Sequence, residues 1–184
     1  EKPQRVNEVW FGDHHQFDCF VLDETGKPVR PWLTAWYDAA TGCLVGWVLC
    51  TNPNTETITE AFIRGVAHTE HSPFYGLPAH LYIDNGKDYR SKTFETGLMS
   101  EHDLGYLNCN IASNSVIQLF NVTIHHAQPY HGWAKTVERF FGTLEDIYIR
   151  DAPGWCGGSP KERPEDFSRD LRRQLEHGQL WTMD

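Results

Sequence analysis

Three acidic residues lie at positions that suit a metal-dependent reaction. Asp13 follows the apolar run at residues 10–12, and Asp84 follows the apolar residues 82–83. Glu138 lies inside an amphipathic stretch of helical character. Carboxylate oxygens suit hard divalent cations, and a pair of such cations supports the in-line displacement of phosphoryl transfer. The pattern therefore indicates metal-dependent polynucleotide chemistry.

Taken singly, each of these acids has an ordinary structural explanation. An aspartate at a strand end is more often a turn former, and Asp84 begins an Asp-Asn-Gly sequence typical of turns. Asp13 has Asp18 and Asp23 as rivals in the same run, and Glu138 alone would be an exposed helical carboxylate. The combination favours a site, because ligands commonly bind at the carboxyl ends of strands in α/β sheets.

An antiparallel meander of three strands is predicted in the first third of the chain. Residues 8–22 have the pattern of a long apolar strand, and residues 30–37 and 43–50 have that of two more. Turn-forming residues 23–28 separate the first strand from the second. Residues 79–83 are a short buried strand, which lies parallel to its neighbour because a crossover helix precedes it.

A crossover helix and a fifth strand complete the expected sheet. Asn54 can cap a helix that runs to about His71, since apolar residues follow at helical spacing. Residues 121–126 have the pattern of a fifth strand, and residues 112–120 are compatible with a helix. The expected fold class is therefore α/β, with a mixed five-stranded sheet flanked by helices.

The third acid lies in a helix predicted from about Trp133 to Tyr148. The apolar face of this helix is expected to comprise Val137, Phe140, Phe141, Leu144 and Tyr148. Lys135 lies one turn before Glu138 and is a candidate contact to a DNA phosphate. An ordinary exposed ion pair between this lysine and the glutamate is an equally weighted alternative.

The chain of 184 residues is expected to form a single catalytic core domain. We place the core at residues 5–150 and regard residues 151–184 as a polar extension, with a helix at 164–176, that leads into a further domain. The absence of an initiator Met is most simply explained by a piece of a longer protein. No apolar run approaches the roughly 20 residues of a membrane span, so no membrane partner is expected.

Cysteine and histidine spacing argues against a zinc site. The five cysteines are scattered without a C-x-x-C pair, which favours reduced thiols in a cytoplasm over a disulfide framework. The doublets His14-His15 and His125-His126 each offer one ligand at most to a given face, because neighbouring strand residues point to opposite faces. His14 or His125 near the carboxylates would tune the site instead.

The net charge of −9 opposes a simple DNA-binding role. Neutralisation of phosphates supplies most of the non-specific affinity for DNA, so a free-standing binder normally carries a basic surface. Two explanations remain open. Part of the acidic excess belongs to the metal site, or DNA binding resides in domains outside this chain, which is the explanation we favour.

Four motifs follow one another in order along the chain. They are Gly12-Asp13, Asp38 ahead of Gly46-Trp47, Ile83-Asp84-Asn85, and Lys135-x-Val137-Glu138-Arg139-x-Phe141-Gly142. Over residues 5–150 this set resembles the DDE transposase and retroviral-type integrase superfamily, and specifically its phage Mu-like branch. The resemblance implies a ribonuclease H-like fold, with Asp13, Asp84 and Glu138 as the catalytic and metal-binding triad. The long spacing from Asp84 to Glu138 agrees with the Mu-like branch.

The resemblance also implies a cofactor and a mechanism. Two Mg²⁺ ions, for which Mn²⁺ can substitute, would be held when DNA is bound. One ion would activate water or a DNA 3′-hydroxyl, and the other would stabilise the leaving oxygen. Asp13 would bridge the ions, while Asp84 and Glu138 would each hold one of them. The candidate DNA contacts are Lys135, Arg139, Asn85 and Lys87.

We therefore expect the catalytic core of a DNA transposase or integrase. Its partners would be DNA, as element ends and as target, and further copies of itself assembled on that DNA. The protein would be bacterial or phage-encoded, cytoplasmic, and associated with the nucleoid when it acts. Two alternatives remain: a ribonuclease H-like nuclease that only hydrolyses, and a catalytically silent DNA-binding or assembly scaffold.

Overall fold

The computed structural model describes residues 3–67, 74–83, 121–126 and 134–183. The chain divides into two compact units, each of which is described by itself. Unit 1 comprises Glu1–Asp13, Thr34–Val48 and Asn54–Ala134. Unit 2 comprises His14–Leu33, Leu49–Pro53 and Lys135–Asp184.

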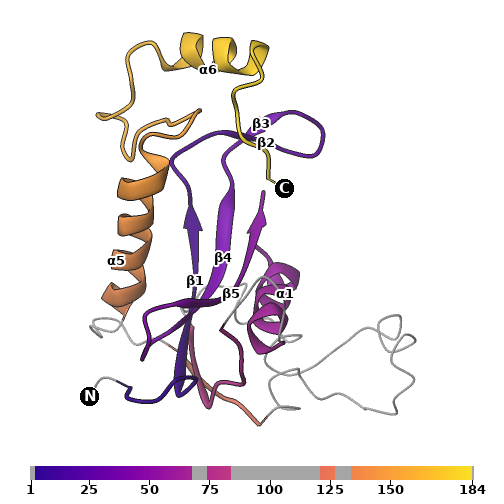
Figure 1. The fold of residues 1–184 in the computed structure, drawn as a ribbon, viewed down its shortest axis with the longest axis vertical. Coiled ribbons are helices and arrows are strands. Elements are labelled where there is room, and N and C mark those ends of the chain that lie inside the picture. Colours follow the sequence, from indigo (N-terminus) through magenta and orange to yellow (C-terminus); the bar gives the residue numbers. More distant parts are fainter. Residues whose placement is uncertain (1–2, 68–73, 84–120, 127–133, 184) are drawn as a thin grey trace, which may run out of the picture. The chain divides into compact units, whose positions relative to one another are not determined.

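The sheet is mixed and five-stranded, as the sequence predicts, and its strand order is β5-β4-β1-β6-β7. Its strands are β1 (Val9–Gln16), β4 (Trp32–Asp38), β5 (Leu44–Cys50), β6 (His80–Ile83) and β7 (Thr123–His126). Figure 1 labels β5, β4 and β1. The central strand β1 pairs in parallel with β6, which in turn pairs in parallel with β7. The crossover rule correctly predicted that β6 would be a parallel neighbour.

The first half of the sheet is antiparallel, because backbone bonds join opposite strand ends. Ala39 N donates to Val9 O over 3.0 Å, and Phe17 N donates to Pro31 O over 3.0 Å. Strand β4 therefore runs against β1. Asp38 N donates to Cys43 O, just before β5, over 2.9 Å, and this bond closes the β4–β5 hairpin.

The predicted long strand at residues 8–22 is wrong in its second half. Strand β1 ends at Gln16, and only the short β2 (Val21–Leu22) follows, paired with β3 (Pro28–Val29). Between β1 and β2 the backbone bonds to other segments, since Cys156 N donates to Asp18 O over 2.8 Å. Local apolar patterning cannot reveal such partners, which are distant in the chain.

Helix α1 (Thr55–Val66) begins at the predicted cap and ends earlier than predicted. Asn54 Oδ1 accepts a bond from Thr57 N (2.9 Å), while Thr57 Oγ1 accepts one from Asn54 N (3.0 Å). The helix stops before the predicted end at His71 because Ala67 is extended. Gly65 O accepts its bond from a later segment, at the Gly76 N–H, over 3.2 Å.

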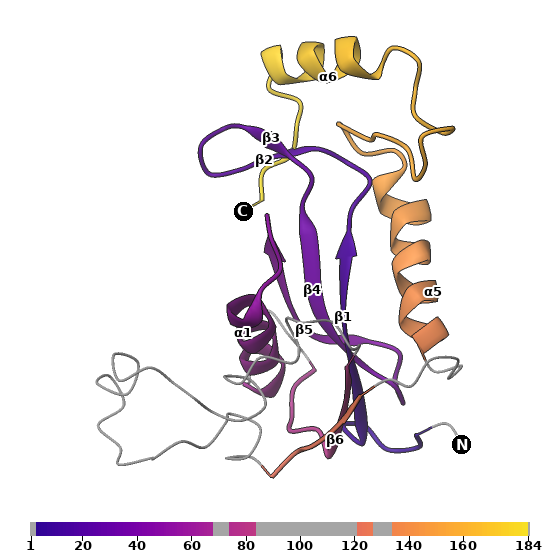
Figure 2. The same ribbon diagram turned by 180° about the vertical axis from the view of Figure 1, so that it is seen from behind.

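The core of unit 1 is apolar and closely packed. Trp10 and Trp36 each contact Phe62 edge to face, with ring centroids 6.0 and 5.8 Å apart. Gly46 on β5 allows α1 to approach, since a Cβ there would lie 2.1 Å from the Ala61 carbonyl oxygen. Figure 2 shows α1 beside β5 from behind.

Helix α5 (Ala134–Leu144) continues into a π-helical segment, Glu145–Ile149. Val137 and Phe141 are buried, as predicted for its apolar face. Tyr148 was wrongly assigned to that face, because it is 63% exposed and Ile149 is only 8% exposed. The wider π turn inserts an extra residue and shifts the buried position by one.

The polar tail of unit 2 contains helix α6 (Phe167–Glu176), close to the predicted bounds. Gly154 N donates to Gln174 Oε1 over 2.7 Å and links the preceding loop to this helix. Among the described residues, no helix is long and apolar enough to cross a membrane. The helix considered at residues 112–120 lies outside the described residues.

Candidate functional site

Asp13 lies on the central strand of the sheet and is half-buried. The parallel register of β1 and β6 ends with the pair Gly12 and Ile83. In the sequence, Asp13 follows the first member of this pair and Asp84 follows the second. Asp84 lies outside the described residues, as do the predicted DNA contacts Asn85 and Lys87.

The two rivals of Asp13 both have structural partners in unit 2. Asp18 Oδ1 accepts a hydrogen bond from Arg30 Nη2 over 2.5 Å. Burial raises the pKa of Asp18, with the nearby Glu145 carboxylate adding to the increase and Arg30 opposing it. Asp23 holds an exposed turn, and hydrogen bonds, first from the Thr25 side chain, lower its pKa. Asp18 and Asp23 thus each have a structural role, and Asp13 stays the predicted ligand of this run.

Asp38, another acid of the sequence motifs, is a structural residue. It is fully buried in unit 1. Its Oδ2 accepts a bond from Asn7 N (2.7 Å), and its Oδ1 accepts bonds from Ala40 N, Thr41 N and Thr41 Oγ1 at 3.1, 2.8 and 2.9 Å. Its two oxygens accept four hydrogen bonds, and these bonds stabilise the β4–β5 turn.

Glu138 and Arg139 lie on α5 of unit 2, and both are exposed. Lys135 lies at the start of the same helix. The buried residues Val137 and Phe141 fix this helix, which leaves the Glu138 carboxylate on its solvent-facing side. Asp13 belongs to unit 1 and Glu138 to unit 2, so each is placed within its own unit.

The donor chemistry of the predicted ligands fits Mg²⁺ or Mn²⁺. Carboxylate oxygens are the ligands these ions prefer, and soft thiolate ligands are disfavoured. Burial raises the pKa of the Cys19 thiol to about 12 and also raises that of Cys156. Within the described ranges, no three acids, histidines or cysteines gather closely enough to hold a metal ion, and Asp84 lies outside those ranges.

The histidines form two separate arrangements. On neighbouring strands of unit 1, His125 Nε2 lies 3.2 Å from His80 Nδ1, and the His125 ring stacks on Tyr82. Burial, followed by the neighbouring His80, lowers the pKa of His125. In unit 2, His15 Nε2 lies 2.8 Å from Glu145 Oε1. The sequence interpretation singled out His14 or His125 as tuning the site, and it missed both the His15–Glu145 contact and the His80–His125 contact.

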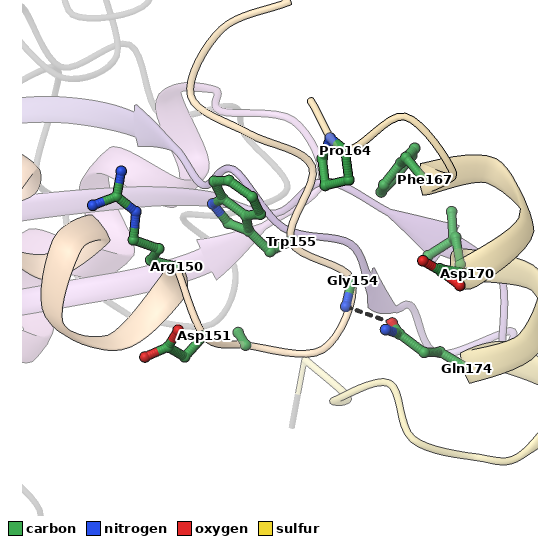
Figure 3. Close-up of a pocket in the computed structure, with 10 residues that line it drawn as sticks. Arg150, Asp151, Gly154, Trp155, Pro164, Phe167, Asp170 and Gln174 are labelled. Atoms are coloured by element: carbon green, nitrogen blue, oxygen red, sulfur yellow. Dashed lines mark hydrogen bonds between the residues drawn. The ribbon is translucent and has the colours of Figure 1, made fainter. Parts of the chain in front are cut away.

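A cavity of about 220 Å³ lies in unit 2 between the loop after α5 and helix α6 (Figure 3). Its lining includes Arg150, Trp155, Pro164 and Phe167. Figure 3 also shows the Gly154–Gln174 hydrogen bond that joins the two walls. Of the predicted ligands that the structure describes, Asp13, Glu138, Lys135 and Arg139, none is in the lining of this cavity.

Comparisons with known proteins relate this chain to transposases. The family model described as the TnsB C-terminal domain matches residues 12–154. The transposase for transposon Tn552 of Staphylococcus aureus is 25% identical over 170 residues, covering 91% of this chain and 30% of that protein. The Mu-like prophage FluMu transposase A of Haemophilus influenzae is 27% identical over 192 residues, with coverage of 93% and 27%. The chain thus spans less than a third of these relatives.

A solved structure supports the predicted fold. A chain in the simian T-cell lymphotropic virus intasome, in complex with the PP2A regulatory subunit B56 gamma, matches with a TM-score of 0.53 and 18% identity. The match covers 95% of this chain and 49% of that chain. Together with the strand order, it shows a ribonuclease H-like α/β fold. Since the family model covers most of the sequence, the chain belongs to the TnsB C-terminal domain family, a transposase and integrase type of domain.

Proposed function

We propose that this domain is the catalytic core of a DNA transposase that cleaves and joins DNA strands with divalent metal ions. The observation that carries the proposal is the position of Asp13. It lies half-buried on the central strand, directly after the last described pair between β1 and β6. The matched family region, residues 12–154, contains all three predicted acids.

In this proposal Asp13, Asp84 and Glu138 hold the metal ions. When bound, the ions would supply Lewis-acid activation of the attacking hydroxyl and stabilisation of the leaving oxygen. The fixed strand β1 would orient Asp13, and the exposed face of α5 would present Glu138 to metal and DNA. Asp18 and Asp38 have structural roles, since Asp18 pairs with Arg30 and Asp38 accepts hydrogen bonds from Asn7 N and Thr41 N.

Four residues are proposed to contact DNA: Lys135, Arg139, Asn85 and Lys87. Arg139 is exposed beside Glu138, where a guanidinium can bind a phosphate through two hydrogen bonds. The net charge of −9 limits the affinity that this domain can supply alone, because phosphate contacts dominate DNA binding. We therefore propose that other parts of the protein recognise element ends, and that several copies assemble on DNA, as the intasome relative suggests.

The test is metal-dependent nicking of supercoiled plasmid, with the protein at its natural length. The amide variants Asp13→Asn, Asp84→Asn and Glu138→Gln should each lose at least about 100-fold in nicking rate. Each removes a carboxylate that would hold a metal ion, and the metal ions would stabilise the charge that develops in the transition state. Asp146→Asn is the matched control, since this side chain is 75% exposed on the segment that follows α5. Wild-type rates in any of the three amide variants would contradict the proposal.

A second assay separates strand transfer from simple hydrolysis. A labelled oligonucleotide with a free 3′-hydroxyl is incubated with plasmid and Mn²⁺, and joined product is measured on a denaturing gel. Joining supports the transposase assignment, whereas cleavage without joining would identify a hydrolytic nuclease. A scaffold would show neither reaction and no carboxylate-dependent Mn²⁺ binding by calorimetry.

A further inference from the structure

A polar link in unit 2 joins the strand of one predicted ligand to the helix of another. His15 lies on β1, two residues after Asp13, and Glu145 follows α5 about two helical turns after Glu138. His15 Nε2 and Glu145 Oε1 are 2.8 Å apart, and their side chains are 23% and 15% exposed. The link therefore lies mostly away from water, where a hydrogen bond between charged or polar groups is strong.

The same glutamate oxygen accepts a second hydrogen bond. Asp18 N donates to Glu145 Oε1 over 3.1 Å, so one carboxylate oxygen bonds both the strand and the chain just after it. The π turn that begins at Glu145 is closed by Arg150 N donating to Glu145 O over 2.9 Å. Single π turns within helices are frequent at functional sites.

Ring stacking fixes the helix in a second direction. The His15 ring stacks on Phe141, with centroids 4.8 Å apart and planes 12° apart. Phe141 is buried and lies one turn after Glu138 on α5. Any rotation of α5 about its axis would break the stack and the hydrogen bond together. The two contacts therefore set the direction in which Glu138 leaves the helix.

The strand side of the link is itself held in place. Arg30 Nη2 donates to Asp18 Oδ1 over 2.5 Å, and Arg30 Nε donates to Phe17 O over 3.0 Å. These bonds fix the backbone that presents Asp18 N to Glu145. Further contacts therefore hold both residues of the His15–Glu145 link in place.

We infer that Glu145 and His15 are positioning residues for the metal site. They set the rotation of α5 so that Glu138 presents its carboxylate to the metal ion. This inference rests on the proposed function, because it requires Glu138 to be a metal ligand. It assigns a role to two residues outside the predicted set of metal and DNA ligands.

The test combines Mn²⁺ titration by calorimetry with plasmid nicking, using the protein at its natural length. Glu145→Ala should weaken Mn²⁺ affinity about 10-fold, which is typical of mutating a residue that orients a metal ligand without binding the metal itself. The Mn²⁺ concentration for half-maximal nicking should rise by a similar factor. Glu145→Gln keeps an acceptor oxygen for both donors and should stay within about 2-fold of the wild type. The neighbouring Asp146→Ala, on an exposed side chain, should change neither value.

These readouts separate positioning from simple stabilisation. A partly unfolded variant loses binding capacity, whereas a mispositioned ligand lowers the affinity of the folded protein. If Glu145→Ala does not fold, His15→Phe decides, since it keeps a ring on Phe141 and removes the Nε2 bond. That variant should weaken Mn²⁺ affinity about 10-fold as well.

Three results would overturn the inference: wild-type Mn²⁺ affinity in folded Glu145→Ala or His15→Phe, an equal loss in Glu145→Gln, or an equal loss in Asp146→Ala. The proposed function fails separately. If Glu138→Gln leaves Mn²⁺ binding and nicking unchanged, the helix carries no ligand, whatever Glu145 does.

Discussion

The two units of this domain are stabilised by different kinds of contact. The interior of unit 1 is sealed and apolar, and Trp10, Trp36 and Phe62 are each 0% exposed. Unit 2 also buries apolar side chains such as Val137 and Phe141, and adds polar links between partly buried side chains, including His15–Glu145 and Asp18–Arg30. Apolar packing supplies stability but gives little direction to any one polar group, whereas a hydrogen-bonded link fixes direction with a small gain in stability. Both kinds of contact concern a predicted ligand. Asp13 lies on β1, whose Trp10 belongs to the apolar core, and Glu138 lies on α5, just before the segment that carries Glu145.

The largest effect should come from adding volume to unit 1. In Gly46→Ala the new Cβ would lie 2.1 Å from Ala61 O and 2.5 Å from Gly65 N, both of them backbone atoms that cannot swing away. We expect a loss of about 3 kcal/mol or more in the free energy of unfolding. Urea denaturation followed by circular dichroism measures it. A loss below about 1 kcal/mol would show that α1 can withdraw from β5 at little cost.

The next largest effect should come from the one buried polar network of the β4–β5 turn. Asp38→Ala leaves donors such as Asn7 N and Thr41 N without their acceptor, and we expect a loss of about 2–3 kcal/mol. Asp23→Ala is the control. Asp23 accepts a comparable set of bonds from Thr25 and Lys27 in an exposed turn, where water can replace it. Equal losses in the two variants would mean that burial does not decide the cost.

A glycine of unit 2 should respond in the opposite direction from Gly46. Gly142 lies within α5, and a Cβ there would meet no atom within 4 Å. Gly142→Ala should therefore raise the free energy of unfolding by about 0.5–1 kcal/mol, since alanine restricts the unfolded chain and favours the helix. Thermal unfolding of the two glycine variants side by side checks the contrast. A destabilised Gly142→Ala protein would reveal a neighbour on this helix face.

The smallest effect should be a pH dependence from the histidine pair of unit 1. The lowered pKa of His125 means that, as pH falls below about 6.5, the unfolded chain takes up a proton sooner than the folded chain. Stability is then lost as the pH falls from that value towards the folded pKa. His125→Asn removes this contribution, so its unfolding free energy should fall less than the wild type's between pH 7.5 and 5.5. Parallel pH profiles would exclude His125 as their source.

The parts of the fold that depend on local signals were predictable from sequence. Asn54 caps α1 as expected, and the crossover rule gives β6 as the parallel neighbour of β1. The split of the run at residues 8–22 was not predictable, because the partner of Asp18 O is Cys156 N, far along the chain. Likewise, the helical period places Tyr148 on the buried face, and only the π turn moves it out.

The candidate site shows the same division. Residue type and order along the chain select Asp13 and Glu138, but they cannot separate Asp13 from Asp18. The structure pairs Asp18 with Arg30, and the choice of Asp13 as the ligand stays a prediction. No local sequence pattern indicates a role for Glu145, because its hydrogen-bond partner His15 lies 130 positions away in the chain. The role of Asp84 remains a prediction from the motif.

The π turn at Glu145–Ile149 has a consequence for comparing this domain with its relatives. A helix that carries one surplus residue keeps its register up to that point and loses it afterwards. In a relative whose helix winds regularly, the counterpart of Ile149 should therefore occur one position earlier. An alignment that continues through this stretch without a gap would pair each later residue with the wrong neighbour, up to the next insertion or deletion.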